Sequence, residues 1–161
     1  MTVQEYNQCV DQFSDGVYRF ILKNLKDEEK AKDIVQSTYE KLWVKADGVS
    51  FNKARSYIFS TAYHTMIDTI RKDKRMEEMI ETKEDEASYF LEYKGINEIL
   101  EKGLQKLPEI QRSVILLRDY EGYSYEEIGE ITQLNESQVK VYIYRARKAM
   151  KEFIGSLEQV L

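Results

Sequence analysis

Apolar residues recur every three or four positions over much of the chain, which is the spacing that places one face of an α-helix on a core. Two such stripes lie in the N-terminal part, and their members are Phe13, Val17, Phe20 and Ile21, then Val35, Tyr39, Leu42 and Trp43. These stripes predict two amphipathic helices, with both Leu42 and Trp43 interpreted as core residues.

A third helix is predicted from about Ala54 to Lys72. Its inner stripe consists of Phe59, Tyr63, Met66, Ile67 and Ile70. Its other side is a continuous polar face, formed by Thr61, His64, Thr65, Asp68, Arg71, Lys72 and Arg75. A polar face of this kind is typical of a helix surface in solvent, and it is equally a candidate binding surface. Between the second and third helices, residues 46–53 contain Asp47-Gly48 and are interpreted as a loop.

Helical periodicity resumes at Ile96. The first of these later helices ends before Pro108, because the residue before proline is pushed out of the α region. Proline is well tolerated in a first turn, so Pro108 starts the next helix, which is expected to reach about Tyr120 and to end at Gly122.

Two N-terminal capping boxes follow and predict a helix-turn-helix. Ser124 stands three positions before Glu127, and Asn135 stands three positions before Gln138. In each pair the short side chain can accept from the N3 amide while the longer one reaches back to the cap amide. The first helix is expected to bury Ile128 and Ile131, with Leu134 in the turn and Gly129 allowing close approach. The second is expected to bury Val139, Ile143, Ala146 and Met150.

The outward face of that second helix carries residue types that read DNA. An α-helix fits the major groove, where Gln can bond adenine, Arg or Lys can bond guanine, and Val can contact the thymine methyl group. The candidate residues are Ser137, Gln138, Lys140, Val141, Tyr142, Tyr144, Arg145 and Arg147. A solvated cationic surface is the simpler interpretation, and the capped helix pair favours DNA binding over it.

Composition and charge divide the chain into parts. One proline and seven glycines are too few for the turns of an all-β protein, so we expect an all-α fold. The formal net charge is −5, and residues 76–95 alone contain seven acids and two cations. We therefore expect two small helical domains, residues 1–75 and 96–161, joined by an acidic linker at 76–95.

Several classes of function are disfavoured. No apolar run is longer than four residues, so neither a membrane span nor a secretory signal is expected, and we predict a cytoplasmic protein. Cys9 and His64 cannot complete a four-ligand zinc site, so no metal or cofactor is expected. Adjacent acids such as Glu126 and Glu127 point apart on a helix and make a poor acid-base pair, so we expect no enzyme and no catalytic residue.

The quoted motifs resemble RNA polymerase sigma factors of the sigma-70 family, in its extracytoplasmic-function subfamily. The C-terminal stretches 107–118, 123–131 and 139–150 resemble the family's DNA-binding region 4. Independently, residues 31–43 resemble the part of region 2 that grips the polymerase, and residues 54–75 resemble its promoter-melting helix. The resemblance implies a sigma region 2 domain of three or four helices and a sigma region 4 helix-turn-helix domain.

The resemblance also implies roles for individual residues. Core polymerase binding falls on Asp33, Gln36, Glu40 and Lys41. Recognition and melting of the minus 10 element falls on Ser50, Phe51, Asn52, Tyr57, His64, Asp68, Arg71, Lys72 and Arg75. Recognition of the minus 35 element is assigned to the outward face from Ser137 to Arg147 described above. Many relatives have glycine in the turn where this chain has Gln133, which must then adopt a left-handed conformation or a different turn.

The implied function is a non-enzymatic specificity subunit that directs transcription initiation at promoters. Its implied partners are core RNA polymerase, through the clamp helices of the largest subunit and the flap region, promoter DNA, and an anti-sigma factor tethered to the membrane. No direct membrane insertion is expected. The alternative is an autonomous helix-turn-helix regulator that acts without polymerase, and a structural protein-binding module is a weaker one.

Overall fold

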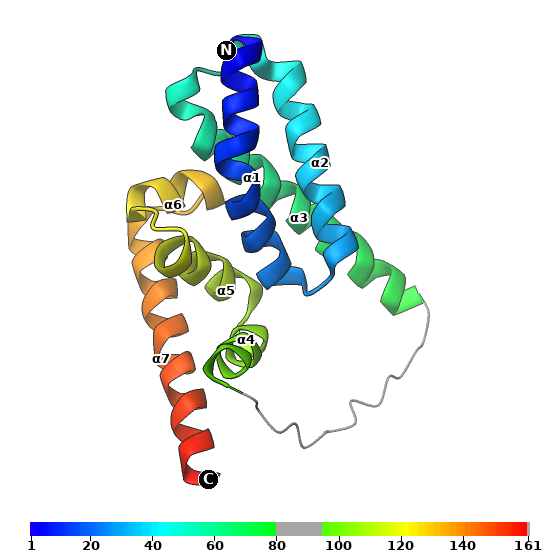
Figure 1. Cartoon of the computed structure of the whole chain (residues 1–161). Helices are drawn as coiled ribbons and strands as arrows, with labels where there is room; N and C mark the ends of the chain where they lie inside the picture. Colours follow the sequence, from blue (N-terminus) through cyan, green and yellow to red (C-terminus); the bar gives the residue numbers. More distant parts are fainter. Residues whose placement is uncertain (80–94, 161) are drawn as a thin grey trace.

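Three long helices make up the N-terminal half of the computed structural model, which describes residues 1–79 and 95–160. They are α1 (Val3–Leu25), α2 (Glu28–Lys45) and α3 (Ala54–Met79). Two short 3-10 turns, η1 (Ala46–Gly48) and η2 (Phe51–Lys53), join α2 to α3. Both α1 and α2 pack on α3 and on each other, as Figure 1 shows. The core between them is formed by Val17, Phe20, Ile21, Ile34, Leu42, Ile58, Phe59 and Met66.

The starts of the first two helices follow from their caps. The Thr2 hydroxyl accepts from the Glu5 amide at 3.1 Å while the Glu5 carboxylate accepts from the Thr2 amide at 2.9 Å, which is a complete capping box. Asp27 caps α2 by accepting from the Lys30 amide at 3.1 Å.

The C-terminal half contains three short helices and one long one. They are α4 (Ile96–Lys106), α5 (Glu109–Ile115), α6 (Tyr125–Thr132) and α7 (Glu136–Val160), and a π-helical turn, η3 (Leu116–Tyr120), continues α5. Helix α7 lies along α4, α5 and α6. Its buried residues are Val139, Ile143, Ala146 and Met150, as the sequence predicted.

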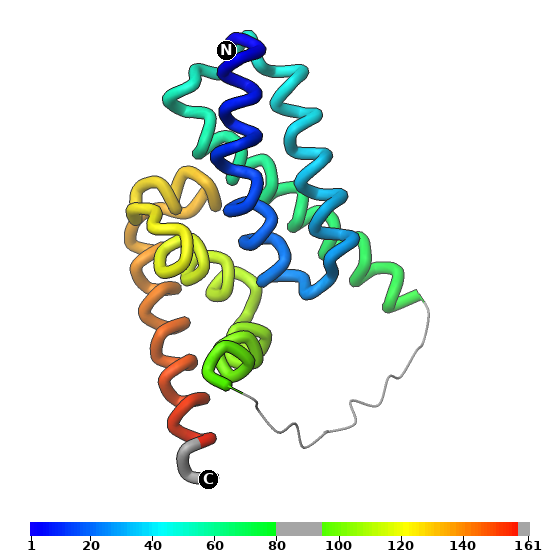
Figure 2. The backbone as a smooth tube through the Cα atoms, in the orientation of Figure 1, coloured from blue at the N-terminus to red at the C-terminus, as the bar shows by residue number. Residues whose placement is uncertain are grey.

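The two halves pack against each other and form one body. Helix α6 lies across α3, while α4 and α5 contact α1 (Figures 1 and 2). Phe59 of α3 shows how the cores meet: its ring is 5.9 Å from that of Phe20 in its own half and 5.1 Å from that of Tyr123 in the other. The sequence did not predict how the two halves are placed relative to each other, and the structure shows that they are in contact.

The predicted all-α class is confirmed over the described residues, in which seven α-helices and no strand occur. Two expectations need correction. Helix α3 continues to Met79 instead of ending near Lys72, so it includes the first four residues of the predicted linker. The rest of the predicted linker up to Lys94 lies outside the described residues. Trp43 is also not a core residue, because 55% of it is exposed.

Candidate nucleic-acid and protein interfaces

The turn between α6 and α7 has the geometry of a helix-turn-helix. The Ser124 hydroxyl and the Glu127 carboxylate complete a capping box at 3.1 Å each, and Asn135 and Gln138 complete the next one at 2.8 and 3.0 Å. Gln133 lies between them with φ 61° and ψ 34°, which is the left-handed conformation, the first of the two alternatives that the sequence left open. Two fixed helix starts and one fixed turn residue hold α7 rigidly relative to α6.

Gly129 is required by the same turn. A Cβ atom built on Gly129 would be 2.7 Å from the carbonyl oxygen of Leu134, and a backbone atom cannot move aside as a side chain would. The Leu134 amide donates to the Gly129 carbonyl at 3.1 Å, so the two residues are held against each other. The expected close approach is therefore confirmed, and its contact is the turn backbone.

The first three turns of α7 present a mostly exposed surface of polar, cationic and aromatic residues. We call it the α7 face, and its exposed members are Ser137, Gln138, Lys140, Val141, Tyr144, Arg145 and Arg147. Tyr144 is 67% exposed and Val141 is 44% exposed, so both can contact a partner. Tyr142, predicted to share this face, is half-buried and packs on the core instead.

Two cations of the α7 face already have partners. Arg147 donates to the carboxylate of Asp119 through Nε at 3.2 Å and Nη2 at 2.5 Å, and this hydrogen bonding raises the pKa of Arg147. Lys140 lies 3.3 Å from Glu136 on its own helix. Arg145 is exposed and forms no ion pair within the described part of the chain, which leaves its guanidinium available to phosphate or a base edge.

Helix α3 carries the second polar surface, the α3 face. Asp68, Arg71, Lys72 and Arg75 are exposed, whereas Tyr57 and His64 are half-buried. The His64 ring is 5.3 Å from that of Tyr63, and its Nε2 atom is buried without a hydrogen-bond partner in the described structure. In the preceding loop Ser50 and Asn52 are exposed, while Phe51 is half-buried and packs on the core.

One ion pair and one hydrogen bond join α2 to α3. Lys30 lies 2.5 Å from Asp73, and this hydrogen bond raises the pKa of Lys30. The Lys41 ammonium donates to the Thr65 hydroxyl at 3.0 Å, so Lys41 lies at the edge between α2 and α3. Both contacts fix α3 relative to α2.

The outer surface of α2 combines polar and apolar residues. Asp33, Gln36, Glu40 and Lys41 are all exposed, and the Gln36 amide donates to the Glu40 carboxylate at 3.2 Å. Beside them Val44 is 79% exposed and Trp43 is 55% exposed, with the Trp43 ring packed edge-on against Tyr6 at 5.0 Å. Sequence reasoning assigned Trp43 to the core and so missed this apolar patch. We name Asp33, Gln36, Glu40, Lys41, Trp43 and Val44 together the α2 surface.

Residues 1–79 and 95–160 contain no group of three or more His, Cys, Asp or Glu side chains that could hold a metal ion. Over the same residues no helix is both long and apolar enough to cross a lipid bilayer.

Two family models match the chain and together include all three surfaces. A family model described as "Sigma-70 region 2" matches residues 9–76, and one described as "Sigma-70, region 4" matches residues 97–150. The first match includes the α2 surface and the α3 face, and the second includes the α7 face.

Individual relatives agree with these matches. The chain is 31% identical to RNA polymerase sigma factor SigV of Bacillus subtilis, over 89% of this chain and 87% of that protein. It is 25% identical to ECF RNA polymerase sigma factor SigM of the same organism, over 94% of each.

Two solved structures share the fold. The sigma factor RpoE of Bartonella quintana, in complex with the anti-sigma factor NepR, matches with a TM-score of 0.78 at 23% identity, over 95% of this chain and 98% of that one. CnrH in complex with the cytosolic domain of CnrY matches with a TM-score of 0.70 at 21% identity, over 94% of this chain and 88% of that one.

Proposed function

The chain belongs to the sigma-70 family of RNA polymerase sigma factors, in its extracytoplasmic-function subfamily, and on this premise we propose a division of labour among its three surfaces. As a sigma factor it is a non-enzymatic transcription initiation factor. In the proposal the α2 surface binds core polymerase, the α3 face binds the minus 10 element, and the α7 face binds the minus 35 element.

The α2 surface suits a protein partner. Exposed tryptophan is among the residues that contribute most to protein interfaces, particularly where polar side chains surround it. Trp43 and Val44 supply the apolar centre, and Asp33, Gln36 and Glu40 supply a polar rim. This arrangement fits the docking of polymerase, on the clamp helices of its largest subunit.

The α3 face suits unpaired DNA. Stacking of an aromatic ring on an exposed base contributes about 1 to 3 kcal/mol, and Tyr57 and His64 are the partly exposed rings of this face. Arg71, Lys72 and Arg75 supply exposed cations for backbone phosphate. The loop residues Ser50, Phe51 and Asn52 precede α3 and complete the proposed minus 10 site.

The α7 face suits the major groove, and the helix-turn-helix is the observation that carries the whole proposal. Ser137, Gln138 and Val141 lie in the first two turns of α7, where groove-reading residues are found in helix-turn-helix proteins. Arg145 lies one turn further on and suits phosphate or guanine.

The proposed domains follow these surfaces: residues 1–75 for polymerase and the minus 10 element, 76–95 as a linker, and 96–161 for the minus 35 element. We further propose that an anti-sigma factor, tethered to the membrane, restrains the chain, because the similar sigma factor RpoE is bound to the anti-sigma factor NepR and CnrH is bound to the cytosolic domain of CnrY. A cytoplasmic location fits a subunit of polymerase, and the flap region is a second proposed contact on that enzyme.

The test is a pull-down of bacterial core RNA polymerase by the tagged chain, followed by run-off transcription from a pool of genomic promoter fragments. We expect stable association and a small set of selective transcripts. Trp43→Ala should weaken core association by about tenfold or more, the size typical of a central interface tryptophan. Met79→Ala is the matched control, because Met79 is an exposed apolar residue outside the three surfaces.

Two results would contradict the proposal. The first is failure of the wild-type chain to bind core. The second is tight, selective promoter binding by the chain alone, which is what the autonomous regulator would show. That alternative is disfavoured because the family match includes residues 9–76 as well as the helix-turn-helix.

A further inference from the structure

One cation of the α7 face is held by an acid from a different element. Asp119 lies in the π-helical turn η3 and its carboxylate accepts two hydrogen bonds from Arg147, from Nε at 3.2 Å and from Nη2 at 2.5 Å. Two parallel donors of a guanidinium are also the arrangement by which arginine binds a phosphate group or the edge of guanine. The Asp119 carboxylate therefore occupies donors of Arg147 that DNA would use.

The π-helical turn fixes the position of Asp119 within the C-terminal half. The Glu121 amide donates to the Leu116 carbonyl at 3.1 Å, which closes the turn around Asp119. The Arg118 guanidinium donates to the Tyr123 carbonyl at 2.8 Å and so holds the turn to the chain that follows it. The backbone on both sides of Asp119 is therefore hydrogen-bonded.

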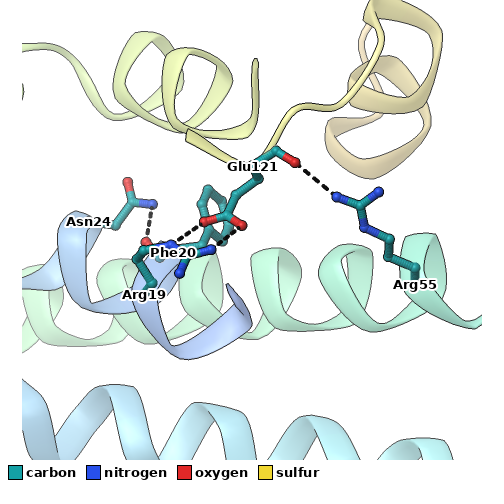
Figure 3. Close-up of polar contacts among 5 residues, drawn as sticks. All are labelled: Arg19, Phe20, Asn24, Arg55 and Glu121. Carbon is teal, nitrogen blue, oxygen red and sulfur yellow. Dashed lines mark hydrogen bonds and ion pairs between the residues drawn. The ribbon is translucent and has the colours of Figure 1, made fainter. Parts of the chain in front are cut away.

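Contacts from the N-terminal half hold the same turn. Arg19 donates to both carboxylate oxygens of Glu121 at 2.8 Å, and Arg55 donates to the Glu121 carbonyl at 2.8 Å, as Figure 3 shows. The Glu121 side chain is only 6% exposed, whereas that of Asp119 is 36% exposed. Asp119 thus extends toward solvent from a fixed backbone, where it can compete with DNA for Arg147.

Acids lie against two of the three cations of the α7 face. Besides the pair of Arg147 with Asp119, Lys140 lies 3.3 Å from Glu136. Arg145 forms no ion pair within the described part of the chain. The α7 face therefore combines neutral residues that can contact base edges with only one unpaired cation.

Phosphate contacts and base contacts contribute differently to the choice of a DNA site. Phosphate contacts increase the affinity for every sequence, whereas base contacts distinguish one sequence from another. A promoter competes with roughly a million or more other sites in a genome, so the ratio of the two affinities decides which site is occupied. An arginine paired with a carboxylate releases no counterion from DNA until that pair breaks, and it therefore adds little to the affinity for random sequence.

We propose that Asp119 is a specificity-determining residue, which keeps Arg147 from binding DNA phosphate and so lowers the affinity for random sequence relative to the promoter. Asp119 contacts no DNA in this scheme and acts through Arg147. Because the ion pair is partly exposed, DNA can break it at a modest cost, and the restraint is partial. The preference for promoters rests on the proposed function, whereas the restraint of Arg147 applies to any duplex.

Binding of the full-length chain to a labelled duplex of random sequence, followed by fluorescence anisotropy over a series of salt concentrations, tests the restraint. Asp119→Asn keeps the shape of the side chain and removes its charge. We expect about two- to fivefold tighter binding at about 0.1 M salt. The plot of log K against log salt concentration should become steeper by up to about 0.9, which is the contribution of one phosphate contact.

Three further variants separate this effect from a change in total charge or in stability. Asp119→Glu keeps the charge and should bind like the wild type, and Glu130→Gln removes an exposed acid of α6 that forms no ion pair within the described residues. In an Arg147→Ala background, Asp119→Asn should leave the salt dependence unchanged, because its effect requires Arg147. Thermal unfolding followed by circular dichroism shows whether any variant merely loses stability.

Holoenzyme binding tests the specificity. We expect the ratio of affinities for a promoter and for the same promoter with a scrambled minus 35 element to fall by at least about twofold in Asp119→Asn. An unchanged or larger ratio would overturn the proposal. So would an unchanged salt dependence of the free chain, or weaker binding to random duplex, which would show that Asp119 positions Arg147 for DNA. If the wild-type holoenzyme does not distinguish the two promoters, the proposed function fails, and the random-duplex measurement still decides whether Asp119 restrains Arg147.

Discussion

At the scale of single residues, the turn between α6 and α7 depends on a side chain in an unfavourable conformation. Gln133 has a positive φ of 61°, which disfavours every residue with a Cβ atom and suits glycine. Its amide donates to the Gly129 carbonyl, which satisfies the end of α6. The hydrogen bonds and capping boxes thus maintain the turn, although glycine, the residue that suits this conformation, is absent from position 133.

Replacing Gln133 with glycine should therefore stabilise the chain. We expect the free energy of unfolding to rise by about 0.5 to 1 kcal/mol, because glycine removes the left-handed strain and this gain exceeds the added entropy of the unfolded chain. Urea denaturation followed by circular dichroism measures the change. Gln133→Ala keeps a Cβ atom and should show no such gain; a glycine variant less stable than the alanine variant would disprove the explanation.

The conformation of a residue could be predicted where it depends on side chains nearby in the sequence. The burial of Trp43 depends on the whole helix, and its prediction was wrong. Both capping boxes follow from side chains three positions apart, whereas the left-handed conformation of Gln133 was one of two alternatives that the sequence left open. The stripe on α2, however, is centred on Ala31, Thr38 and Leu42, all fully buried. Alanine and threonine are only weakly hydrophobic, so the pattern did not identify them as core residues. The large apolar Trp43 was therefore assigned to the buried face, although it lies on the exposed side.

At the scale of elements, α7 separates a structural side from a binding side. Val139, Ile143, Ala146 and Met150 face the core at helical spacing, while the α7 face points outward. Among its arginines, Arg147 is paired with Asp119 and Arg145 is not paired within the described residues. The two positions therefore differ in how freely they can contact DNA.

We expect Arg145→Ala to weaken holoenzyme binding to its promoter by about 1 to 3 kcal/mol, or roughly 5- to 150-fold. Arg147→Ala should have a smaller effect, because its guanidinium is already bound to Asp119. Electrophoretic mobility shifts at physiological salt measure both variants. Equal losses at the two positions would show that the ion pair does not restrain Arg147, and unchanged affinity for Arg145→Ala would remove that contact.

The existence and order of the helices could be predicted, but their ends and irregularities could not. The acidic run after Arg75 indicated a linker, yet methionine and glutamate are good helix formers and α3 continues to Met79. The π-helical turn at 116–120 has no sequence signal. It ends with the Glu121 amide donating to the Leu116 carbonyl at 3.1 Å, at the residue whose carboxylate pairs with Arg19.

At the scale of the whole molecule, the packing of the halves could not be predicted from the sequence. Arg19 and Glu121 are 102 positions apart, and no local pattern relates them. The apolar stripes of each half have the same helical spacing whether or not the halves meet, although the buried residues of both form one core. Only the three-dimensional arrangement brings the complementary charges together.

This arrangement should respond to salt. The screening length falls from roughly 10 Å at 0.1 M to about 3 Å at 1 M, so partly exposed ion pairs such as Arg19–Glu121 and Lys26–Glu101 weaken. We expect the radius of gyration of the free chain to increase between these salt concentrations while helix content stays constant. Sucrose at equal osmolality serves as the uncharged control. A radius independent of salt would mean that the aromatic contacts around Tyr123 alone keep the halves together.

The exposed ring of Trp43 has a practical consequence. It is the chain's one tryptophan, and it lies on the α2 surface. Its fluorescence in water is that of an indole largely in contact with solvent, and transfer into a dry interface shifts indole emission toward the blue. In a polymerase preparation whose own tryptophans were replaced by a non-emitting analogue, assembly could then be followed in real time from the natural chain, without any attached dye.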